Sequence, residues 1–118
     1  MHELSIAQSV VGIACRHAAG RKVTKVKLQV GWLRQVVPSA LSFSFDLVAQ
    51  GTPVEGAELE IVSVPAMGRC RVCAGETELR AFPFQCKACH SFDLQIVAGE
   101  ELIVESLELE EAEVGTAT

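Results

Sequence analysis

Four of the five cysteines form two Cys-x-x-Cys pairs, which is the clearest chemical signal in the sequence. The pairs are Cys70 with Cys73 and Cys86 with Cys89, separated by residues 74–85. A gap of two residues lets one turn of chain present both thiolates to a single ion, so two such turns complete a tetrahedron around Zn²⁺. The spacing therefore predicts a zinc ribbon or knuckle. Four protein thiolates predict a closed, structural site, because a catalytic zinc keeps one position open for water.

Disulfides or a redox pair are alternative interpretations of these cysteines. Disulfides suit a secreted protein, but the N-terminal sequence MHELSIAQ has no basic segment followed by an apolar run. A thioredoxin-like site needs one pair at the start of a helix in a βαβ setting, whereas here two pairs lie in a loop-rich segment. Zinc is therefore the favoured interpretation. His90 directly follows Cys89, and we expect it to lie exposed or beside the site, because adjacent residues seldom both reach one metal.

His2 is a second candidate metal ligand. A histidine in the second position places its imidazole, its own amide nitrogen and the terminal amine of Met1 within one chelate. Such a nitrogen-rich arrangement suits square-planar Ni²⁺ or Cu²⁺. An exposed terminal histidine without a metal is the ordinary alternative, and these residues alone leave both interpretations open.

Composition and charge narrow the classes of function. The 118 residues suffice for one domain, or for one domain with a small appendage. A net charge of −5 argues against a nucleic-acid binder, which needs a cationic stripe, and the cations near the cysteines alternate with glutamates as on a solvated surface. No apolar run approaches the ~20 residues that cross a bilayer, and reduced thiols indicate the cytoplasm. With no Ser/His/Asp set and no glycine-rich phosphate loop, we expect no enzyme activity.

Two amphipathic helices are predicted from the spacing of apolar residues. Residues 3–19 place such residues three or four positions apart, and a second helix begins near Pro38 and ends at Gly51. Phe43 is expected in the core, whereas Trp32 is left open between core and partner surface. The other side chains expected to face inward are Leu4, Ala7, Val10, Val11, Ala14, Cys15 and Ala18 in the first helix, and Leu41, Phe45 and Val48 in the second.

Three strands are predicted to complete the first domain. Residues 25–30, 57–64 and 101–109 alternate between apolar and polar side chains. The side chains expected to face inward are Val26, Leu28 and Val30, then Ala57, Leu59 and Ile61, then Ile103, Leu107 and Leu109. Because the third strand follows the cysteines, the zinc module is predicted to be an insertion, with a short strand at 92–97 leading back to the first domain.

The predicted fold class is therefore α+β. A small three-stranded sheet with two helices, formed by residues 1–65 and 99–112, carries an inserted zinc-ribbon-like domain at 66–98. Residues 113–118 have neither period nor bulk and are expected to form a flexible tail. The inserted domain is expected to move on hinges near Pro65–Gly68 and Ala98–Gly99, because only two short segments cross into it.

Three stretches of the sequence together resemble the HypA/HybF family of hydrogenase nickel-insertion proteins. They are MHELSIAQSV at the terminus, VGWLRQVVPSALSFSFDLVAQGTPVEGAELEI in the middle, and the paired Cys-x-x-Cys motifs with their closing strand. The resemblance covers residues 1–110. Members of this family often carry an acidic residue shortly before the second helix, but here that neighbourhood is GWLRQVVPS. A carboxylate from this segment is therefore not expected at the nickel site.

The resemblance implies a small cytoplasmic metallochaperone that is not itself an enzyme. It implies that Ni²⁺ is held by Met1, His2 and Glu3, and that structural zinc is held by Cys70, Cys73, Cys86 and Cys89. The implied partners are a HypB-like maturation GTPase and the large subunit of a [NiFe] hydrogenase, with no nucleic acid or membrane, and a homodimer is left open. The alternatives are a zinc-ribbon adaptor or nucleic-acid-binding module without nickel function, and a zinc-dependent hydrolase, which would need an open metal position.

Overall fold

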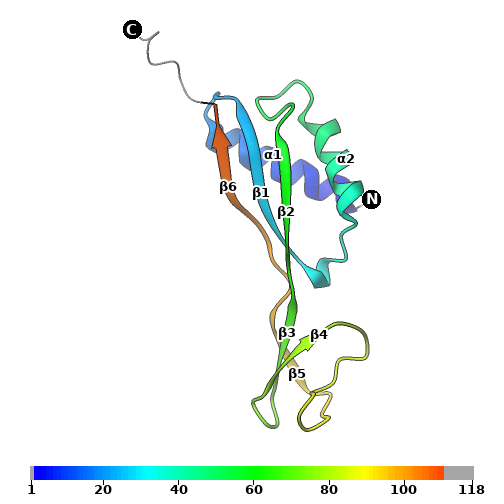
Figure 1. Cartoon of the computed structure of the whole chain (residues 1–118). Helices are drawn as coiled ribbons and strands as arrows, with labels where there is room; N and C mark the ends of the chain where they lie inside the picture. The colour runs from blue at the N-terminus through cyan, green and yellow to red at the C-terminus, as the bar shows by residue number, and fades with distance from the viewer. Residues whose placement is uncertain (1, 111–118) are drawn as a thin grey trace. The chain divides into compact units, whose positions relative to one another are not determined.

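The computed structural model describes residues 2–110, so the candidate ligand Met1 and the predicted tail at 113–118 lie outside the described residues. Within this range the chain forms two α-helices and two three-stranded sheets, which confirms the predicted α+β class (Figure 1). The elements are α1 (His2–Ala18), β1 (Val23–Gly31), the 3₁₀ helix η1 (Trp32–Arg34), α2 (Pro38–Ala49), β2 (Glu58–Val64), β3 (Ala66–Cys70), β4 (Glu76–Leu79), β5 (Leu94–Ala98) and β6 (Leu102–Leu109).

The described chain divides into two compact units. Unit 1 comprises residues 2–28, 37–61 and 104–110, and unit 2 comprises residues 29–36 and 62–103. Three of the four boundaries between the units fall inside β1, β2 and β6, and the fourth lies between residues 36 and 37, just before α2. The predicted zinc insertion at 66–98 lies within unit 2. Unit 2 also contains η1, which the sequence alone does not associate with the cysteines. The two units are described separately below, and the division into domains stays a prediction.

In unit 1, α1 buries an apolar stripe along its length. The stripe contains Ile6, Ala7, Val10, Val11, Ala14 and Ala18, with Cys15 half-buried beside it. Leu4, which was expected in this stripe, is 38% exposed, because it lies at the margin of the buried face. The helix ends where Ala19 and Gly20 adopt positive φ angles of 51° and 87°, the left-handed conformation that commonly terminates helices.

The second helix, α2, packs against α1. Its buried residues Leu41, Phe45 and Ala49 recur every four positions and are at most 1% exposed. The expectation that Phe43 joins the core was wrong, since its side chain is 70% exposed. Phe43 lies on the side of α2 opposite to the line of Leu41 and Phe45, and the phase of the helix is set by these larger buried contacts. Neither α1 nor α2 is long and apolar enough to cross a membrane.

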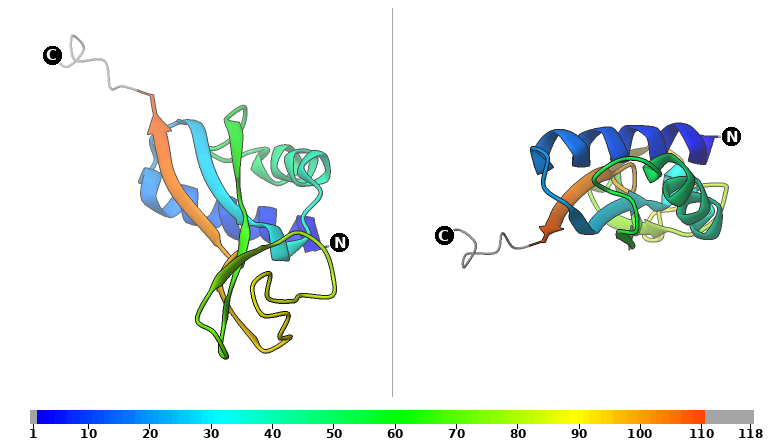
Figure 2. Two further views of the ribbon diagram at one scale, coloured as in Figure 1. Left: turned by 60° about the horizontal axis from the view of Figure 1, so that its bottom comes forward. Right: turned by 90° about the horizontal axis from the view of Figure 1, so that it is seen from above.

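The sheet to which unit 1 contributes has the strand order β2-β1-β6, and α1 runs along one of its faces (Figure 2). Burial along β1 alternates as predicted, with Val26, Leu28 and Val30 facing inward. In β6 the alternation shifts by one residue at Glu105–Ser106. Ile103, expected to face inward with Leu107, is therefore 48% exposed.

In unit 2, the antiparallel strands β4, β3 and β5 form a second small sheet with β3 in the centre. The predicted strand at 92–97 is present as β5, which begins two residues later than expected and ends one residue later, and Phe92 before it is 65% exposed. Gly68 was expected at a hinge, but it lies inside β3, opposite Thr77 of β4 and Ile96 of β5. A Cβ atom at this position would lie 3.3 Å from Leu79 Cδ1, so close packing within the sheet accounts for the glycine.

Two glycines permit a close backbone approach that attaches residues 29–36 to the rest of unit 2. A Cβ atom on Gly31 would collide with the carbonyl group of Gly99, and one on Gly99 would lie 2.5 Å from Ala66 Cα. Gly99 also has a φ of 112°, a conformation that side chains disfavour. The Gly31 amide donates to Glu101 O (2.7 Å) and the Leu33 amide to Gly99 O (2.8 Å). These contacts place η1 in unit 2.

Candidate metal sites

The four predicted zinc ligands converge on one point in unit 2. The Sγ atoms of Cys70, Cys73, Cys86 and Cys89 all lie within 4.8 Å of one another. Two of these Sγ pairs, Cys70 with Cys89 and Cys73 with Cys86, are 3.6 Å apart. A disulfide has an S–S length of ~2.0 Å, whereas tetrahedral Zn–S bonds of ~2.3 Å place sulfur atoms about 3.8 Å apart. The four thiols therefore have the donor type and spacing of a tetrathiolate zinc site.

The two Cys-x-x-Cys turns share one backbone design. In the first, the Ala74 amide donates to Cys70 O (2.9 Å), and in the second the His90 amide donates to Cys86 O (3.0 Å). Ala74 and His90 both have positive φ angles, of 65° and 66°. His90 is thus a left-handed turn residue with an exposed side chain, and it lies outside the cysteine cluster among the described residues, as expected.

Backbone amides in both turns donate to the first cysteine of each pair. The amides of Val72 and Cys73 lie 3.3 and 3.5 Å from Cys70 Sγ, and the Cys89 amide lies 3.4 Å from Cys86 Sγ. Because these donors favour the charged thiolate, the Cys73 amide lowers the pKa of Cys70, and the Cys89 amide lowers that of Cys86 to about 6. Thiolates are the form that binds metal, so the turns prepare Cys70 and Cys86 for a cation. Hydrogen bonding to the Cys70 thiol instead raises the pKa of Cys89 to about 12, so this thiol loses its proton only when a metal takes its place.

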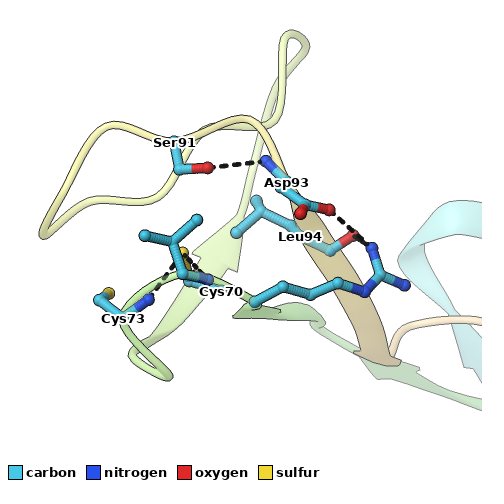
Figure 3. Close-up of polar contacts among 7 residues, drawn as sticks. Cys70, Cys73, Ser91, Asp93 and Leu94 are labelled. Carbon is cyan, nitrogen blue, oxygen red and sulfur yellow. Dashed lines mark hydrogen bonds and ion pairs between the residues drawn. The ribbon is translucent and has the colours of Figure 1, made fainter.

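An ion pair and a backbone bond join the first turn to the start of β5. Arg71 Nη1 donates to Asp93 Oδ1 (2.9 Å), and the Arg71 amide donates to Asp93 O (2.9 Å). The Asp93 amide in turn donates to Ser91 Oγ (3.0 Å), just beyond the second turn (Figure 3). Arg69 and Arg80 likewise pair with Glu76 and Glu78. Arg69, Arg71 and Arg80 thus lie in ion pairs with glutamates or an aspartate on a solvated surface, as expected for the cations near the cysteines.

The candidate nickel site lies at the start of α1 in unit 1. The His2 side chain is 52% exposed, and its Nε2 lies 3.5 Å from Glu3 Oε2. Glu3 itself is only 8% exposed, and its Oε2 accepts a hydrogen bond from the Val37 amide (3.1 Å). That donor, together with the amide of Glu3 itself, lowers the pKa of the Glu3 carboxyl group.

Because His2 lies at the start of α1, its backbone amide has no acceptor within the helix. The first four N–H groups of an α-helix have no acceptor within the helix, so a metal at the amide nitrogen of His2 does not disrupt helical hydrogen bonds. The imidazole of His2 and the carboxylate of Glu3 lie close together here, and their role as nickel ligands stays a prediction. The terminal amine of Met1, the third predicted donor, belongs to a residue outside the described range.

Two features of the molecule were missed by the sequence analysis. The first is the Val37 amide, a backbone group that has no signal in the sequence. The second is an aromatic cluster in unit 2, in which Trp32 lies 6.4 Å from the rings of Phe82 and of Phe84, and those two rings stack at 4.2 Å. The short Phe-Pro-Phe segment before the second cysteine pair is the only sequence hint of this cluster. The sequence left open whether Trp32 faces the core or a partner, and in the structure it contacts this aromatic cluster within unit 2.

Comparison with known proteins shows which family this chain resembles. A family profile described as hydrogenase/urease nickel incorporation, metallochaperone, hypA matches residues 1–109. The chain is 46% identical over 111 residues to the hydrogenase maturation factor HypA of Nostoc punctiforme, covering 94% of this chain and 97% of that protein. It is 49% identical over 110 residues to the protein of the same name from Geobacter sp. (strain M21), covering 93% and 100%.

Solved structures agree with this comparison. The fold matches a solution structure of a HypA protein with a TM-score of 0.68 and 26% identity, covering 93% of this chain and 97% of that one. It also matches the solution structure of the Ni metallochaperone HypA from Helicobacter pylori with a TM-score of 0.65, covering 91% and 96%. At 24% identity the second match supports the fold alone.

Proposed function

Because the chain belongs to the HypA family of hydrogenase/urease nickel-incorporation metallochaperones, we propose that it carries Ni²⁺ at its N-terminus and delivers it to the large-subunit precursor of a [NiFe] hydrogenase. The observation that supports the nickel site most directly is the juxtaposition of the His2 imidazole with the buried Glu3 carboxylate, 3.5 Å apart at the start of α1. A half-exposed ligand of this kind suits a cargo metal, which has to be loaded and released.

In this proposal Met1, His2 and Glu3 bind the cargo. The Met1 amine, the His2 imidazole and the amide nitrogens of His2 and Glu3 are the nitrogen donors that a square-planar d⁸ ion prefers. The Glu3 carboxylate lies beside the imidazole and offsets the charge of the incoming cation. A peptide nitrogen binds nickel only after it has lost its proton, so nickel has to displace the protons of both amides as well as any proton on the imidazole or the amine. Its affinity therefore declines as the solution is acidified.

We further propose that Cys70, Cys73, Cys86 and Cys89 hold one structural Zn²⁺. The mutual spacing of the four thiols and their amide donors support this assignment. Zinc bound there supplies folding free energy and no open coordination position. This donor set argues against the zinc-dependent hydrolase, and the protein is proposed not to be an enzyme.

The family assignment also indicates the setting in which the protein works. The partners proposed are the hydrogenase large subunit and a HypB-like GTPase, in the cytoplasm, without nucleic acid or membrane; a homodimer is not required by this proposal. The alternative, a zinc-ribbon adaptor without nickel function, differs in one measurable respect. It has no need for a second metal site, and His2 would be dispensable.

Calorimetric titration of the untagged protein with Ni²⁺ tests the nickel site. We expect His2→Ala to bind nickel at least about tenfold more weakly, because an equatorial donor is removed, with zinc content and fold unchanged. His17→Ala is the matched control, since His17 is exposed on the same helix and far along it from the N-terminus. Residues added before Met1 should also weaken binding, since the amine becomes an amide. Equal binding by all forms would replace the chaperone proposal with the adaptor.

Delivery needs a separate test. Nickel-loaded wild type and nickel-exposed His2→Ala are each mixed with the purified large-subunit precursor, the proteins are separated, and the nickel on the precursor is measured by elemental analysis. We expect nickel on the precursor after incubation with wild type and with His17→Ala, and little after incubation with His2→Ala. Equal transfer from free nickel salt and from the wild type would argue against delivery.

A further inference from the structure

The Glu3 carboxylate is held by the entry to α2 as well as by its own helix. Val37 is the residue before Pro38 and has an extended conformation, with φ −87° and ψ 111°. Its carbonyl accepts from the Leu41 amide (3.0 Å) and so begins α2, while its amide donates to Glu3 Oε2 (3.1 Å). One residue thus joins the start of α2 to the start of α1, within unit 1.

The same carboxylate oxygen faces the candidate nickel ligand. Glu3 Oε2 lies 3.1 Å from the Val37 nitrogen and 3.5 Å from His2 Nε2. A buried carboxylate needs hydrogen-bond donors to hold it in place. The Val37 amide therefore influences where this carboxylate lies relative to the His2 imidazole.

We propose that the Val37 N–H group is a positioning group of the nickel site, which holds the Glu3 carboxylate beside the His2 imidazole. This inference rests on the proposed function. It is of particular weight in this chain because residues 31–39, GWLRQVVPS, contain no carboxylate. The entry to α2 then contributes to the site through a backbone donor that fixes the glutamate of α1.

The size of the expected effect on nickel affinity follows from similar arrangements at other metal sites. Groups that orient a metal ligand through a hydrogen bond usually change metal affinity by about 10–100-fold when they are removed. Val37 is 53% exposed, so its side chain contributes little to the core, and its effect is expected to come from the amide. This makes the amide testable by a pair of substitutions that differ in the presence of the N–H group.

Val37→Pro removes the donor, and Val37→Ala keeps it. The φ of −87° is close to the range that proline adopts, and residue 37 already precedes a proline, so the extended conformation is tolerated. In calorimetric titrations we expect nickel affinity to fall about tenfold in Val37→Pro and to stay at the wild-type value in Val37→Ala. Zinc content and the amide NMR spectrum of unit 1 check that both variants are folded.

A spectroscopic measurement separates positioning from a general effect on structure. The amide proton resonance of Val37 is expected to shift when wild type is titrated with nickel, and to remain unchanged when His2→Ala is titrated. If Val37→Pro does not fold, Glu3→Asp serves instead, because it keeps the charge but is one methylene too short for both contacts. We expect Glu3→Asp to lose about tenfold in nickel affinity as well.

The outcomes distinguish this inference from the proposed function. If wild type and His2→Ala bind nickel equally, the nickel site itself is wrong, and the inference fails with it. If His2→Ala loses nickel while Val37→Pro, or Glu3→Asp where it replaces that variant, binds like wild type, only the role of the Val37 amide is overturned. Equal losses in Val37→Ala and Val37→Pro would also overturn it, because the side chain and not the amide would then matter.

Discussion

Unit 1 and unit 2 bury different kinds of side chain. Unit 1 packs α1 and α2 around fully buried residues such as Leu28, Leu41 and Phe45, none more than 1% exposed. Unit 2 buries few large apolar side chains. Its buried hydrophobic residues are Val30, Ala66, Cys70, Leu79 and Cys86. Two of those five are cysteines of the thiol cluster.

The difference indicates two sources of stability in one chain. An apolar core gains roughly 25 cal/mol for each Å² removed from water, and unit 1 has the helices and sheet to bury such surface. A unit as small as unit 2 usually needs a metal or disulfides in addition to its core. The thiol cluster supplies the ligands for a metal, so unit 2 is expected to depend on zinc and unit 1 to be independent of it.

The largest effect is expected from a cysteine of the thiol cluster. Cys86→Ser removes one of four zinc ligands, and structural zinc contributes about 10–16 kcal/mol of apparent binding free energy. Elemental analysis should find no zinc, and the amide NMR signals of unit 2 should collapse while those of unit 1 remain. Cys15→Ser is the control, since Cys15 lies half-buried in α1 and outside the cluster, and it should keep its zinc. Loss of both units in Cys86→Ser would contradict their independence.

The reverse experiment destabilises unit 1. Phe45→Ala removes a ring that is 1% exposed and should lower the free energy of unfolding of unit 1 by about 3–5 kcal/mol, measured by urea denaturation. Phe43→Ala, two residues away but 70% exposed, should change it by less than about 0.5 kcal/mol. Zinc should stay bound in both variants. Comparable losses from the two phenylalanines would mean that the phase of α2 is wrong.

A smaller effect is expected in the aromatic cluster of unit 2. Trp32 is the only tryptophan, and the rings of Phe82 and Phe84 that it contacts lie just before the second cysteine pair. Removing zinc with a chelator should therefore shift Trp32 emission to longer wavelength. Phe84→Ala should shift it with zinc still bound and cost about 1 kcal/mol in ring contacts. Phe92→Ala is the control, because Phe92 is 65% exposed and is not part of this cluster. If chelation leaves the emission spectrum unchanged, the aromatic cluster does not depend on bound zinc.

The smallest effect is expected from an ion pair on the sheet of unit 1. Lys25 Nζ lies 2.8 Å from Glu60 Oε1, and this hydrogen bond lowers the pKa of Glu60 below its ordinary 4.5. A carboxyl group with a lowered pKa contributes stability above its unfolded pKa, and that contribution is lost as pH falls from 4.5 through the lowered value. The free energy of unfolding of unit 1, measured between neutral and acidic pH, should thus depend less on pH in Glu60→Gln than in wild type. If it changes with pH equally in both proteins, the exposed ion pair contributes nothing measurable to stability.

Features with a local cause could be predicted from the sequence. The spacing within each Cys-x-x-Cys pair sets the turn that presents both thiols, and alternation along β1 places Val26 and Leu28 inward wherever the strand lies. The two helices and the α+β class follow from periodicity in the same way. The family assignment needs only the order of such motifs along the chain, and it was confirmed over residues 1–109.

Features that depend on residues distant in the sequence appeared only in the tertiary structure. The exposure of Phe43 depends on which side of α2 meets α1, and Trp32 meets Phe82 fifty positions later in the chain. The bond from the Val37 amide to Glu3 joins groups 34 residues apart, and a backbone donor has the same chemistry at nearly every position. Residue types and local periods thus determined the helices, the strands and the candidate ligands. Packing decided which ligand is held by which element, because long-range contacts depend on the whole fold and not on the pattern of any one segment.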